Sequence, residues 1–554
     1  MNQRIIRILI ALGATLVVLT AAPYPMFDLS RFFAPKELVM NAVALLLALA
    51  ALREAKKLEL NRIDLALAAY LSLCFISASL AQNHWLSIAA LAITLSGATV
   101  FWVARSTAKA GARDAIIAVA ASAAVLGALV SLAQAYGFNC ALFSPHRIPG
   151  GTLGNRNFMA HLAVICLPVL ILSAIKSRRL FLAGAAGVFI IVQALVLSRT
   201  RAAWLGFAAG AIVLGCGFWR ARGELDSKTS SRLKALLAAG LVGALAALAL
   251  PNKLEWTSDS PYMDTVSGLA NYHSGSGHGR LIQYERTLRI VAAHPLLGAG
   301  PGNWEIVYPK FVKGFDRSID YGTGITFNPW PSSDWMAILS ERGIPAFAAL
   351  LLALFWLLLS AWRRVAMAAN EDEYLQGLML AATIIITATV GCFDAVILLP
   401  ATAFMTWAIL GALAPDMPVL QSLDISPRMR GKLILAATFA GIVAILRSAG
   451  QVAAMAQYSK AHTITQYALA SRLDPGNFHI RMHLESLKRR GITRANPIPM
   501  PSAPPERASD ETAEPAPGAT PPLPGTGFEA STDSTSSDGT NTSTASVQAS
   551  TAAK

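Results

Sequence analysis

The chain has 554 residues and a formal net charge of +14, and its composition is 54 % hydrophobic but only 14 % charged, with a mean hydropathy of +0.49. Soluble globular domains carry about a quarter charged residues, so this composition excludes an ordinary soluble fold and predicts an integral membrane protein. The positive charge does not indicate nucleic-acid binding, because the Lys and Arg residues fall in short segments between apolar runs rather than in one patch.

Apolar runs recur from the N-terminus to about residue 449. Since backbone polar groups cannot stay unpaired in lipid, each run is expected to form a helix. We predict an all-α integral membrane protein with about 12–13 transmembrane helices and one large loop before the third- or fourth-last helix. The expected spans are 5–22, 37–52, 64–81, 85–103, 114–136, 158–175, 180–197, 202–219, 234–250, 344–361, 374–392, 396–413 and 432–449.

A segment rich in Lys and Arg follows every second expected span. These segments are 53–62, 104–113, 176–179, 220–234, 363–364 and 427–432. If the helices alternate in direction, all of these segments lie on the same side as the N-terminus. An excess of Lys and Arg in short loops marks the cytoplasmic side, so we predict a cytoplasmic N-terminus.

The sequence divides into five regions. Residues 1–250 contain the first nine helices, 251–331 form one long extracytoplasmic loop with short helices, and 332–449 contain the last four helices. A loop of that length in a compact domain is usually functional. Residues 450–491 resemble a single tetratricopeptide-type helical hairpin that turns at DPGN and needs a surface to dock on. Residues 492–554 are rich in Pro, Ser and Thr and are predicted to be disordered.

Several arginines break the charge pattern of the loops. Arg147 and Arg156 lie between the fifth and sixth spans, and Arg199 and Arg201 lie between the seventh and eighth. One explanation is snorkelling, in which arginines at helix ends reach the lipid headgroups. The other is a phosphate site at the outer leaflet, because guanidinium groups present planar bidentate donors and stay charged.

The long loop contains a helix signal followed by a turn signal. The spacing in RLIQYERTLRIVAAH places Arg280 and Tyr284 on one helical face. HPLLGAGPGNW, residues 294–304, then ends the helix and predicts a tight turn with free backbone amides. Its GAGPGN is a weak match to a nucleotide-binding loop, because no strand precedes it and no Walker lysine follows. A structural turn is the simplest interpretation.

Four segments in order resemble the O-antigen ligase and polymerase superfamily, membrane glycosyltransferases whose donor is a polyprenyl-diphosphate-linked glycan. They are GGTLGNRNFMAHLA (150–163), LSRTRAAWLG (197–206), GRLIQYERTLRIVAAHPLLGAGPGNWEIVYPKF (279–311) and SSDWMAILSERGIPA (332–346). The combination of HPLLGAGPGNW and SERG is the most specific part. The resemblance implies a multi-pass protein of the bacterial cytoplasmic (inner) membrane with its active site at the outer face. With thirteen alternating spans, the C-terminal tail is expected on the same, periplasmic side.

The resemblance also implies site residues. One essential arginine of the family matches Arg201, three residues before Trp204, and a second matches Arg280. The topology and the helical spacing had already singled out both residues. The further substrate-binding candidates are Asn155, Arg156, Asn157, Arg199, Tyr284, Asn303 and Tyr308.

Sugar transfer from a polyprenyl diphosphate releases a leaving group of growing negative charge, which positioned guanidinium groups can stabilise without a metal. The five cysteines lie mostly inside apolar spans without paired spacing, and no outward cluster of aspartates is present, so we expect neither a metal nor a cofactor. The expected partners are the lipid-linked glycan donor, a hydroxyl acceptor on a glycan, lipid or protein, membrane lipid and other envelope polysaccharide assembly proteins. Nucleic acid is not expected.

An acceptor hydroxyl must also lose a proton to a general base. The family usually has a histidine before Asn-Asp at the tenth span, and alignment places Ser332 at that histidine, Ser333 at the asparagine and Asp334 at the aspartate. A serine is no base near neutral pH. Either Asp334 takes the task, or His273 or His278 reaches in, or the protein is not catalytic in the usual way. Capping of the following helix is the other role open to Asp334.

The leading hypothesis is therefore a glycosyltransferase acting as polymerase, ligase or protein O-oligosaccharyltransferase, which differ only in the acceptor. A second hypothesis is a non-catalytic relative that organises a polysaccharide export complex. A third is a transporter or flippase, which would place ionisable side chains near the bilayer midplane.

Overall fold

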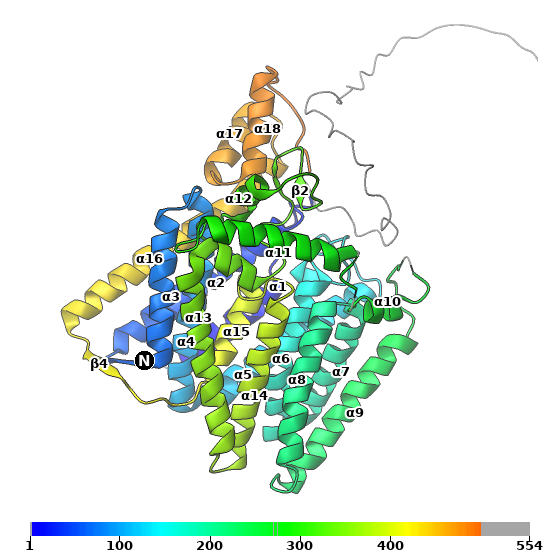
Figure 1. The fold of residues 1–554 in the computed structure, drawn as a ribbon, viewed down its shortest axis with the longest axis vertical. Helices are drawn as coiled ribbons and strands as arrows, with labels where there is room; N and C mark the ends of the chain where they lie inside the picture. The colour runs from blue at the N-terminus through cyan, green and yellow to red at the C-terminus, as the bar shows by residue number, and fades with distance from the viewer. Residues whose placement is uncertain (1–2, 257, 270, 274, 500–554) are drawn as a thin grey trace, which may run out of the picture. The chain divides into compact units, whose positions relative to one another are not determined.

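The structure, a computed structural model, describes residues 3–256, 258–269, 271–273 and 275–499, all within one compact unit. In this part of the chain, ten helices are long and apolar enough to cross a membrane, and His84–Ala135 counts once although Gly111 interrupts it. The prediction of an all-α integral membrane protein is confirmed (Figure 1).

Each predicted span overlaps one apolar helix of the bundle. The helices are α1 (Gln3–Leu19), α2 (Ser30–Glu54), α3 (Arg62–Ser79), α4 (His84–Thr107), α5 (Arg113–Ala135), α6 (Arg156–Lys176), α7 (Phe181–Ser198), α8 (Arg201–Arg220), α9 (Ser227–Ala249), α13 (Asp334–Ala366), α14 (Glu371–Gly391), α15 (Pro400–Leu413) and α16 (Pro427–Ser459). The π-turn η1 (Ala108–Ala112) joins α4 to α5, and the 3-10 turn η2 (Gly151–Leu153) precedes α6.

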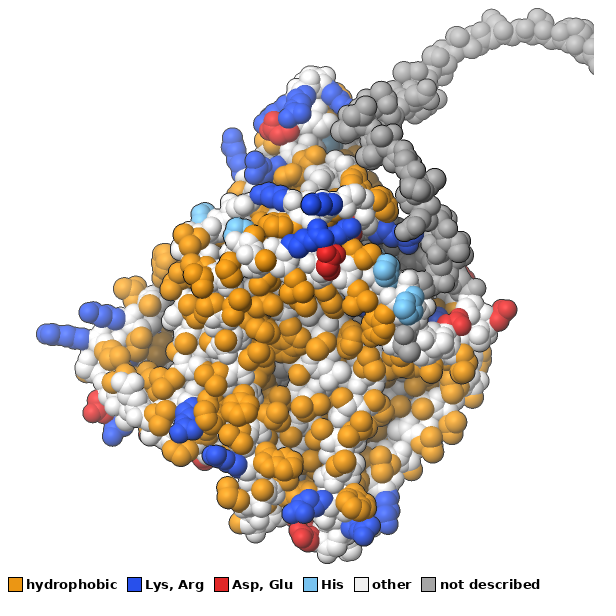
Figure 2. Space-filling model, viewed as in Figure 1, with side chains coloured by type: hydrophobic (Ala, Val, Ile, Leu, Met, Phe, Trp, Pro, Cys, Tyr) orange, Lys and Arg blue, Asp and Glu red, His pale blue; other side chains and the backbone are white. Residues whose placement is uncertain are grey.

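Helix α6 lies at the centre of the bundle, because 94 % of the residues in its most apolar stretch are buried. Helix α9 is peripheral, because only 22 % of the residues in its most apolar stretch are buried. The outer face of α9 exposes large apolar side chains at helical spacing, such as Leu237, Leu241 and Leu245. On the face shown in Figure 2, hydrophobic side chains cover the middle, and Lys and Arg gather towards the two ends. This distribution is what a lipid-facing surface requires.

The basic segments between alternate spans meet at one end of the bundle. Strand β1 (Lys57–Leu60) pairs with β4 (Gln421–Asp424) in antiparallel register. Nearby ion pairs join Lys109 to Asp416 at 2.7 Å and Lys176 to Asp372 at 2.8 Å. These contacts support the predicted alternation of the helices, and the cytoplasmic assignment of this end stays a prediction.

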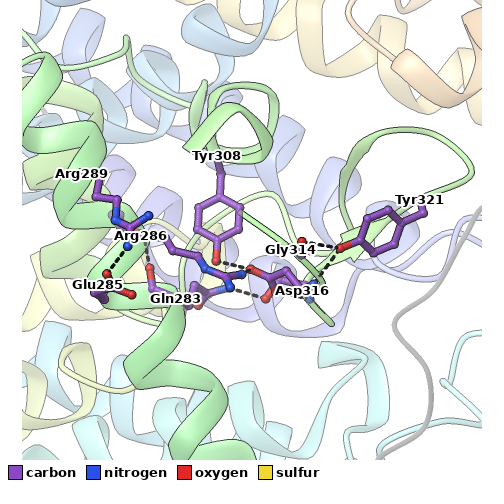
Figure 3. A network of polar contacts seen from close by, with 10 residues as sticks. Gln283, Glu285, Arg286, Arg289, Tyr308, Gly314, Asp316 and Tyr321 are labelled. Carbon is purple, nitrogen blue, oxygen red and sulfur yellow. Dashed lines mark hydrogen bonds and ion pairs between the residues drawn. The ribbon is translucent and has the colours of Figure 1, made fainter. Parts of the chain in front are cut away.

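The chain between α9 and α13 folds over the opposite end, which we call the loop end, and α11 lies across it (Figure 1). Asp316 organises this loop (Figure 3): its carboxylate pairs with Arg286 and accepts from the Tyr308 hydroxyl at 2.7 Å, and its backbone N–H donates to Tyr321 at 2.7 Å. The loop elements are α10 (Pro261–Ser267), α11 (Gly275–Ala293), α12 (Trp304–Val307), η3 (Tyr308–Phe311), β2 (Ile319–Asp320) and β3 (Ile325–Thr326).

Helix α13 is interrupted near its start. Gly343 adopts φ 82° and ψ 169°, which is not helical, so carbonyls in the preceding turn lose their partners in α13. Segment 294–303, which we call the glycine turn, supplies new partners. The backbone N–H of Ala299 donates to Ser340 O at 2.9 Å, and that of Gly300 donates to Glu341 O at 2.8 Å.

The contact between the glycine turn and the break leaves no room for side chains at two glycines. A Cβ on Gly343 would lie 2.2 Å from the carbonyl oxygen of Leu296, and a Cβ on Gly298 would lie 2.2 Å from the carbonyl carbon of Glu341. The N–H of Ile344, just after the break, donates to the carbonyl oxygen of Pro295 in the glycine turn at 2.8 Å. The HPLLGAGPGNW and SERG segments are therefore the two halves of one backbone contact.

The predicted helical hairpin is present as α17 (Ile464–Leu473) and α18 (Phe478–Arg489). Its buried Tyr467 and Ile480 belong to one apolar cluster with Phe27, which precedes α2, and Tyr458, which lies at the end of α16. The preceding stretch from 451 to 459 is not part of the hairpin but continues α16.

The packed chain also extends past the predicted hairpin boundary at residue 491. The Tyr467 hydroxyl donates to Ala495 O at 3.1 Å, and the Ala495 N–H donates to His462 O at 3.1 Å. From residue 500 onward, the predicted disordered tail lies outside the described residues.

The break in α13 predicts a strong effect of one added methyl group. We expect Gly343→Ala to destabilise the protein by about 1–3 kcal/mol or more, because it adds both left-handed strain and a clash with the glycine turn. Thermal unfolding in a membrane mimetic would measure the effect. Gly215→Ala, where an added Cβ meets nothing within 4 Å, is the matched control and should be neutral. Equal losses in both variants would contradict the proposed interlock.

Candidate functional site

Arginines from three helix ends gather at the loop end of the bundle. Arg156 begins α6, Arg201 begins α8, and Arg199 ends α7 in a left-handed conformation with φ 52°. The junctions are tied together, because the Thr200 hydroxyl donates to the Asn157 side chain at 3.1 Å. We call Arg156, Arg199 and Arg201 the basic cluster.

Asn155 and Asn157, two predicted substrate-binding residues, shape the start of α6. The side chain of Asn155 is buried and caps the helix by accepting from the Asn157 N–H at 2.9 Å. The Asn157 side chain is engaged by the start of α8. These contacts give both asparagines the task of fixing the arginine-bearing helix ends.

The loop covers the basic cluster from above. The guanidinium carbon of Arg199 lies 4.5 Å from the ring centroid of Trp256, and that of Arg156 lies 5.3 Å from it. The Nε of Arg199 donates to Thr265 in α10 at 3.0 Å, and Nη1 of Arg201 donates to Gly268 O at 2.7 Å. Burial, and then the neighbouring charge of Arg156, lower the pKa of Arg199. An anion bound among these groups would relieve their mutual repulsion.

Helix α11 brings a further guanidinium group over the same end. Arg280 and Tyr284 are one turn apart, and the Tyr284 hydroxyl lies within donating distance of the carbonyls of Ser332, at 2.6 Å, and Cys392, at 2.7 Å. Burial raises the pKa of Tyr284, while the charge of Arg280 opposes that shift and the charge of Asp394 adds to it. Tyr284 therefore stays protonated and fixes α11 above the segments that flank α13 and α15.

Asp394 lies near these residues but was not among the predicted site residues. It is partly buried in the turn between α14 and α15, and its charge acts on both Tyr284 and His161. Among the described residues, its side-chain hydrogen bond is local: the Ala395 N–H donates to Oδ1 at 2.8 Å. The sequence shows a single carboxylate in the short segment CFDAVILLP, but not which distant residues lie beside it.

His161 is the second missed residue. Its side chain is fully buried on α6, and neither ring nitrogen has a hydrogen-bond partner among the described residues. The charges of Asp394 and Arg280 both act on it. It lies five residues after Arg156, about 7.5 Å along the helix. Helix α6 thus links the basic cluster to the group formed by Arg280, Tyr284 and Asp394.

Residues 186–351 match the family model described as O-antigen ligase. The match supports the O-antigen ligase/polymerase superfamily. The matched segment includes Arg199, Arg201 and Arg280, and it spans the loop and the interrupted start of α13. No curated protein matches the chain. At the level of the family, the match indicates a membrane glycosyltransferase activity of the O-antigen ligase type.

In this O-antigen ligase-like chain, Asp334 does not cap α13, so that interpretation is wrong. Ser333 caps the helix by accepting from the Met336 N–H at 3.4 Å. The carboxylate of Asp334 is fully buried and accepts from the N–H groups of Val396, at 2.9 and 3.0 Å, and Ile397, at 3.0 Å. A carboxylate enclosed by backbone donors is poorly placed to take a proton from an acceptor, so the geometry favours a structural role.

Two other predicted substrate-binding residues of the matched segment are also buried and hydrogen-bonded within the protein. Asn303 is fully buried, and its Nδ2 donates to Ser87 Oγ at 2.9 Å and to Asn83 O at 3.2 Å, which ties the glycine turn to α4. Tyr308 is fully buried in the Asp316 network. Both are positioned to hold the loop rather than to meet a substrate. His273 and His278, the alternative bases, have exposed side chains.

We expect substitution by asparagine to affect stability differently at Asp334 and Asp394. Asp334→Asn would turn an amide group towards backbone N–H donors, and we expect a loss of about 1–3 kcal/mol of stability. Asp394→Asn removes only a local contact and should change stability by about 0.5 kcal/mol or less. Unfolding of the two variants in the same membrane mimetic tests this difference. A stable Asp334→Asn protein would show that the buried carboxylate is not the anchor of the turn before α15.

Proposed function

We propose that this protein is a membrane glycosyltransferase that moves or polymerises a polyprenyl-diphosphate-linked saccharide at its loop end. The single observation that carries the proposal is the convergence of the basic cluster and Arg280 on one end of an apolar bundle. This end is opposite the one where the basic segments meet, so we propose that it faces the periplasm, outside the bacterial cytoplasmic membrane.

The basic cluster has the chemistry of a diphosphate site. Arg156 and Arg201 each stand in the first turn of a long helix, where backbone N–H groups and the helix dipole also favour an anion. Guanidinium groups fit phosphate oxygens in a bidentate manner and stay charged. The charge that develops on the departing polyprenyl diphosphate would thus be stabilised by fixed side chains, and we propose that the reaction needs no metal.

The lipid part of the donor has a matching surface beside these arginines. Helices α8 and α9 expose apolar side chains over most of their length, including Ile212 on α8 and Leu241 on α9. A polyprenyl chain could remain in the lipid along this face while its diphosphate reaches the start of α8. The donor would then enter from the membrane rather than from water.

We propose Asp394 as the general base in place of the histidine that Ser332 replaces. The acceptor oxygen forms a bond to the anomeric carbon while the bond from that carbon to the diphosphate oxygen breaks. The acceptor proton passes to Asp394, and the electron pair leaves with the polyprenyl diphosphate. Tyr284 holds α11 beside the turn that carries Asp394, and enclosed His161 acts as a positioning residue beneath it.

Removal of either proposed diphosphate ligand should abolish most transfer. We expect Arg201→Ala and Arg280→Ala each to lower the rate of glycan transfer by about 10²–10³-fold, because a charged donor to the leaving group is lost. The assay uses purified protein in lipid with a polyprenyl-diphosphate-linked oligosaccharide. Arg289→Ala is the matched control on α11, since Arg289 is 44 % exposed and pairs with Glu285. Transfer that survives both substitutions would overturn the proposed mechanism, and a wild-type protein that binds donor without transfer would favour the non-catalytic organiser.

The proposed base makes a separate prediction. Asp394→Asn should lower kcat by about 10²–10⁴-fold with little change in donor KM, because the proton acceptor is lost while the arginines remain. Asp394→Glu should retain part of the activity. Full activity in Asp394→Asn would place the base elsewhere and return the exposed histidines to consideration.

A further inference from the structure

A cavity of about 260 Å³ lies between the hairpin turn and the loop end of the bundle. Its walls come from the starts of α2 and α4, the loop, the break in α13, helix α16 and the turn from α17 to α18. We call it the hairpin cavity. Its lining includes Glu37, Glu305, Trp330, Glu341, Arg447 and Asp474.

Aromatic rings connect the hairpin cavity to the proposed transfer site. The ring centroid of Trp330 lies 5.3 Å from that of Phe33 and 6.4 Å from that of Phe158 on α6. Phe158 in turn lies 6.5 Å from His161, which senses the charges of Asp394 and Arg280. Trp330 therefore has the cavity on one side and α6, the helix that begins at Arg156, on the other.

The charge of the hairpin cavity is opposite to that of the basic cluster. Glu37 is paired with Arg447 at 3.0 Å, and among the described residues no ion pair joins Glu305, Glu341 or Asp474 on the cavity wall to a cation. Such a wall repels phosphate and favours hydroxyl groups or an amine.

Glu305 is the carboxyl group most open to a ligand. No hydrogen bond or ion pair joins its side chain to another described residue, whereas Glu341 accepts from the Trp304 N–H at 3.3 Å and Asp474 accepts from the Trp85 ring at 2.7 Å. Burial, and then the charge of Glu341, raise the pKa of Glu305 to about 7. Near neutral pH this carboxyl group can therefore both donate to and accept from a hydroxyl group.

Arg447 gives a second, independent indication of an occupant. Its side chain is 6 % exposed, and its Nη1 donates to Glu37 and, at 2.7 Å, to Gln451. Its Nε has no partner among the described residues although it is buried in the cavity wall. Buried polar groups are almost always paired, so a polar occupant is expected here.

We propose that the hairpin cavity binds the terminal sugar residue of the acceptor, an uncharged or amino sugar without phosphate. The name acceptor rests on the proposed function, while the binding of the sugar does not. Ligand pockets usually span about 300–1,000 Å³ and combine aromatic walls with a few polar groups, so this smaller cavity suits a single sugar residue. The donor diphosphate would then bind the basic cluster on one side of Trp330, and the acceptor sugar would bind the acidic cavity on the other side.

The C-terminal hairpin would then do more than cover the bundle. Asp474, Asn477 and Phe478 at its turn complete the wall of the cavity. The contact of Asp474 with the Trp85 ring fixes that turn against α4. The hairpin therefore forms part of the binding site, and its sequence is expected to influence which acceptor is used.

Direct sugar binding tests the proposal without any transfer reaction. The full-length protein is placed in phospholipid nanodiscs, which avoid sugar detergents, and saturation-transfer NMR is recorded with methyl glucoside, methyl glucosaminide and glucose 6-phosphate at millimolar concentrations. We expect signals from the first two probes and none above background from the phosphate. Glu305→Gln should keep methyl glucoside binding and reduce the preference for methyl glucosaminide.

Filling the cavity provides the decisive variant. Ala89→Phe adds a ring inside the cavity and should abolish binding, whereas Ala69→Phe, on the exposed face of α3, should leave it intact. Binding that persists in Ala89→Phe with an unchanged Tm, no binding of either unphosphorylated probe, or preferred binding of the phosphate would each overturn the proposal. Loss of transfer in Arg201→Ala has no bearing on these signals, so failure of the cavity and failure of the proposed reaction can be told apart.

Discussion

The backbone contact between the break in α13 and the glycine turn is the constraint on which the loop end depends. A helix that is interrupted at the membrane boundary must satisfy its freed carbonyls within the protein, because lipid offers no partners. The glycine turn meets that need at Ser340 and Glu341, and the Ser77 hydroxyl on α3 adds a donor to Glu341 O at 2.9 Å. The long loop is thereby fixed to the bundle, and α11 is held where the charge of Arg280 acts on His161 of α6.

The same break also sends two adjacent charged side chains in different directions. Glu341 lines the hairpin cavity. Arg342 is buried between α3 and α4, where it donates to the Tyr70 hydroxyl and to Thr94 Oγ1, each at 3.0 Å. One local interruption of a helix therefore anchors the loop, contributes a carboxylate to the proposed acceptor site and ties α13 to its neighbours. This explains in physical terms why SERG and HPLLGAGPGNW occur together.

Local patterns were enough to predict much of this structure. Hydropathy predicted the membrane helices, and the DPGN turn predicted the hairpin. Arg199 and Arg201 were identified because they lie in a loop on the side where Lys and Arg are not expected. Asp394 and His161 could not be found in this way, because their relevance comes from the packing of α6 against the turn before α15. The sequence left Asp334 open as a general base or as a cap of its own helix, yet its carboxylate accepts from backbone amides of a segment more than sixty residues later. Contacts between segments that are far apart in the chain leave no periodic pattern in the sequence, so they could not be predicted from it.

A high-resolution structure of the protein in nanodiscs with a bound polyprenyl diphosphate would test the central claim most directly. The account predicts diphosphate oxygens within hydrogen-bond distance of Arg201 and Arg280, with the lipid chain along the outer face of α8 and α9. A diphosphate bound at the opposite end of the bundle, among the basic segments that contain Lys57 and Lys109, would contradict it.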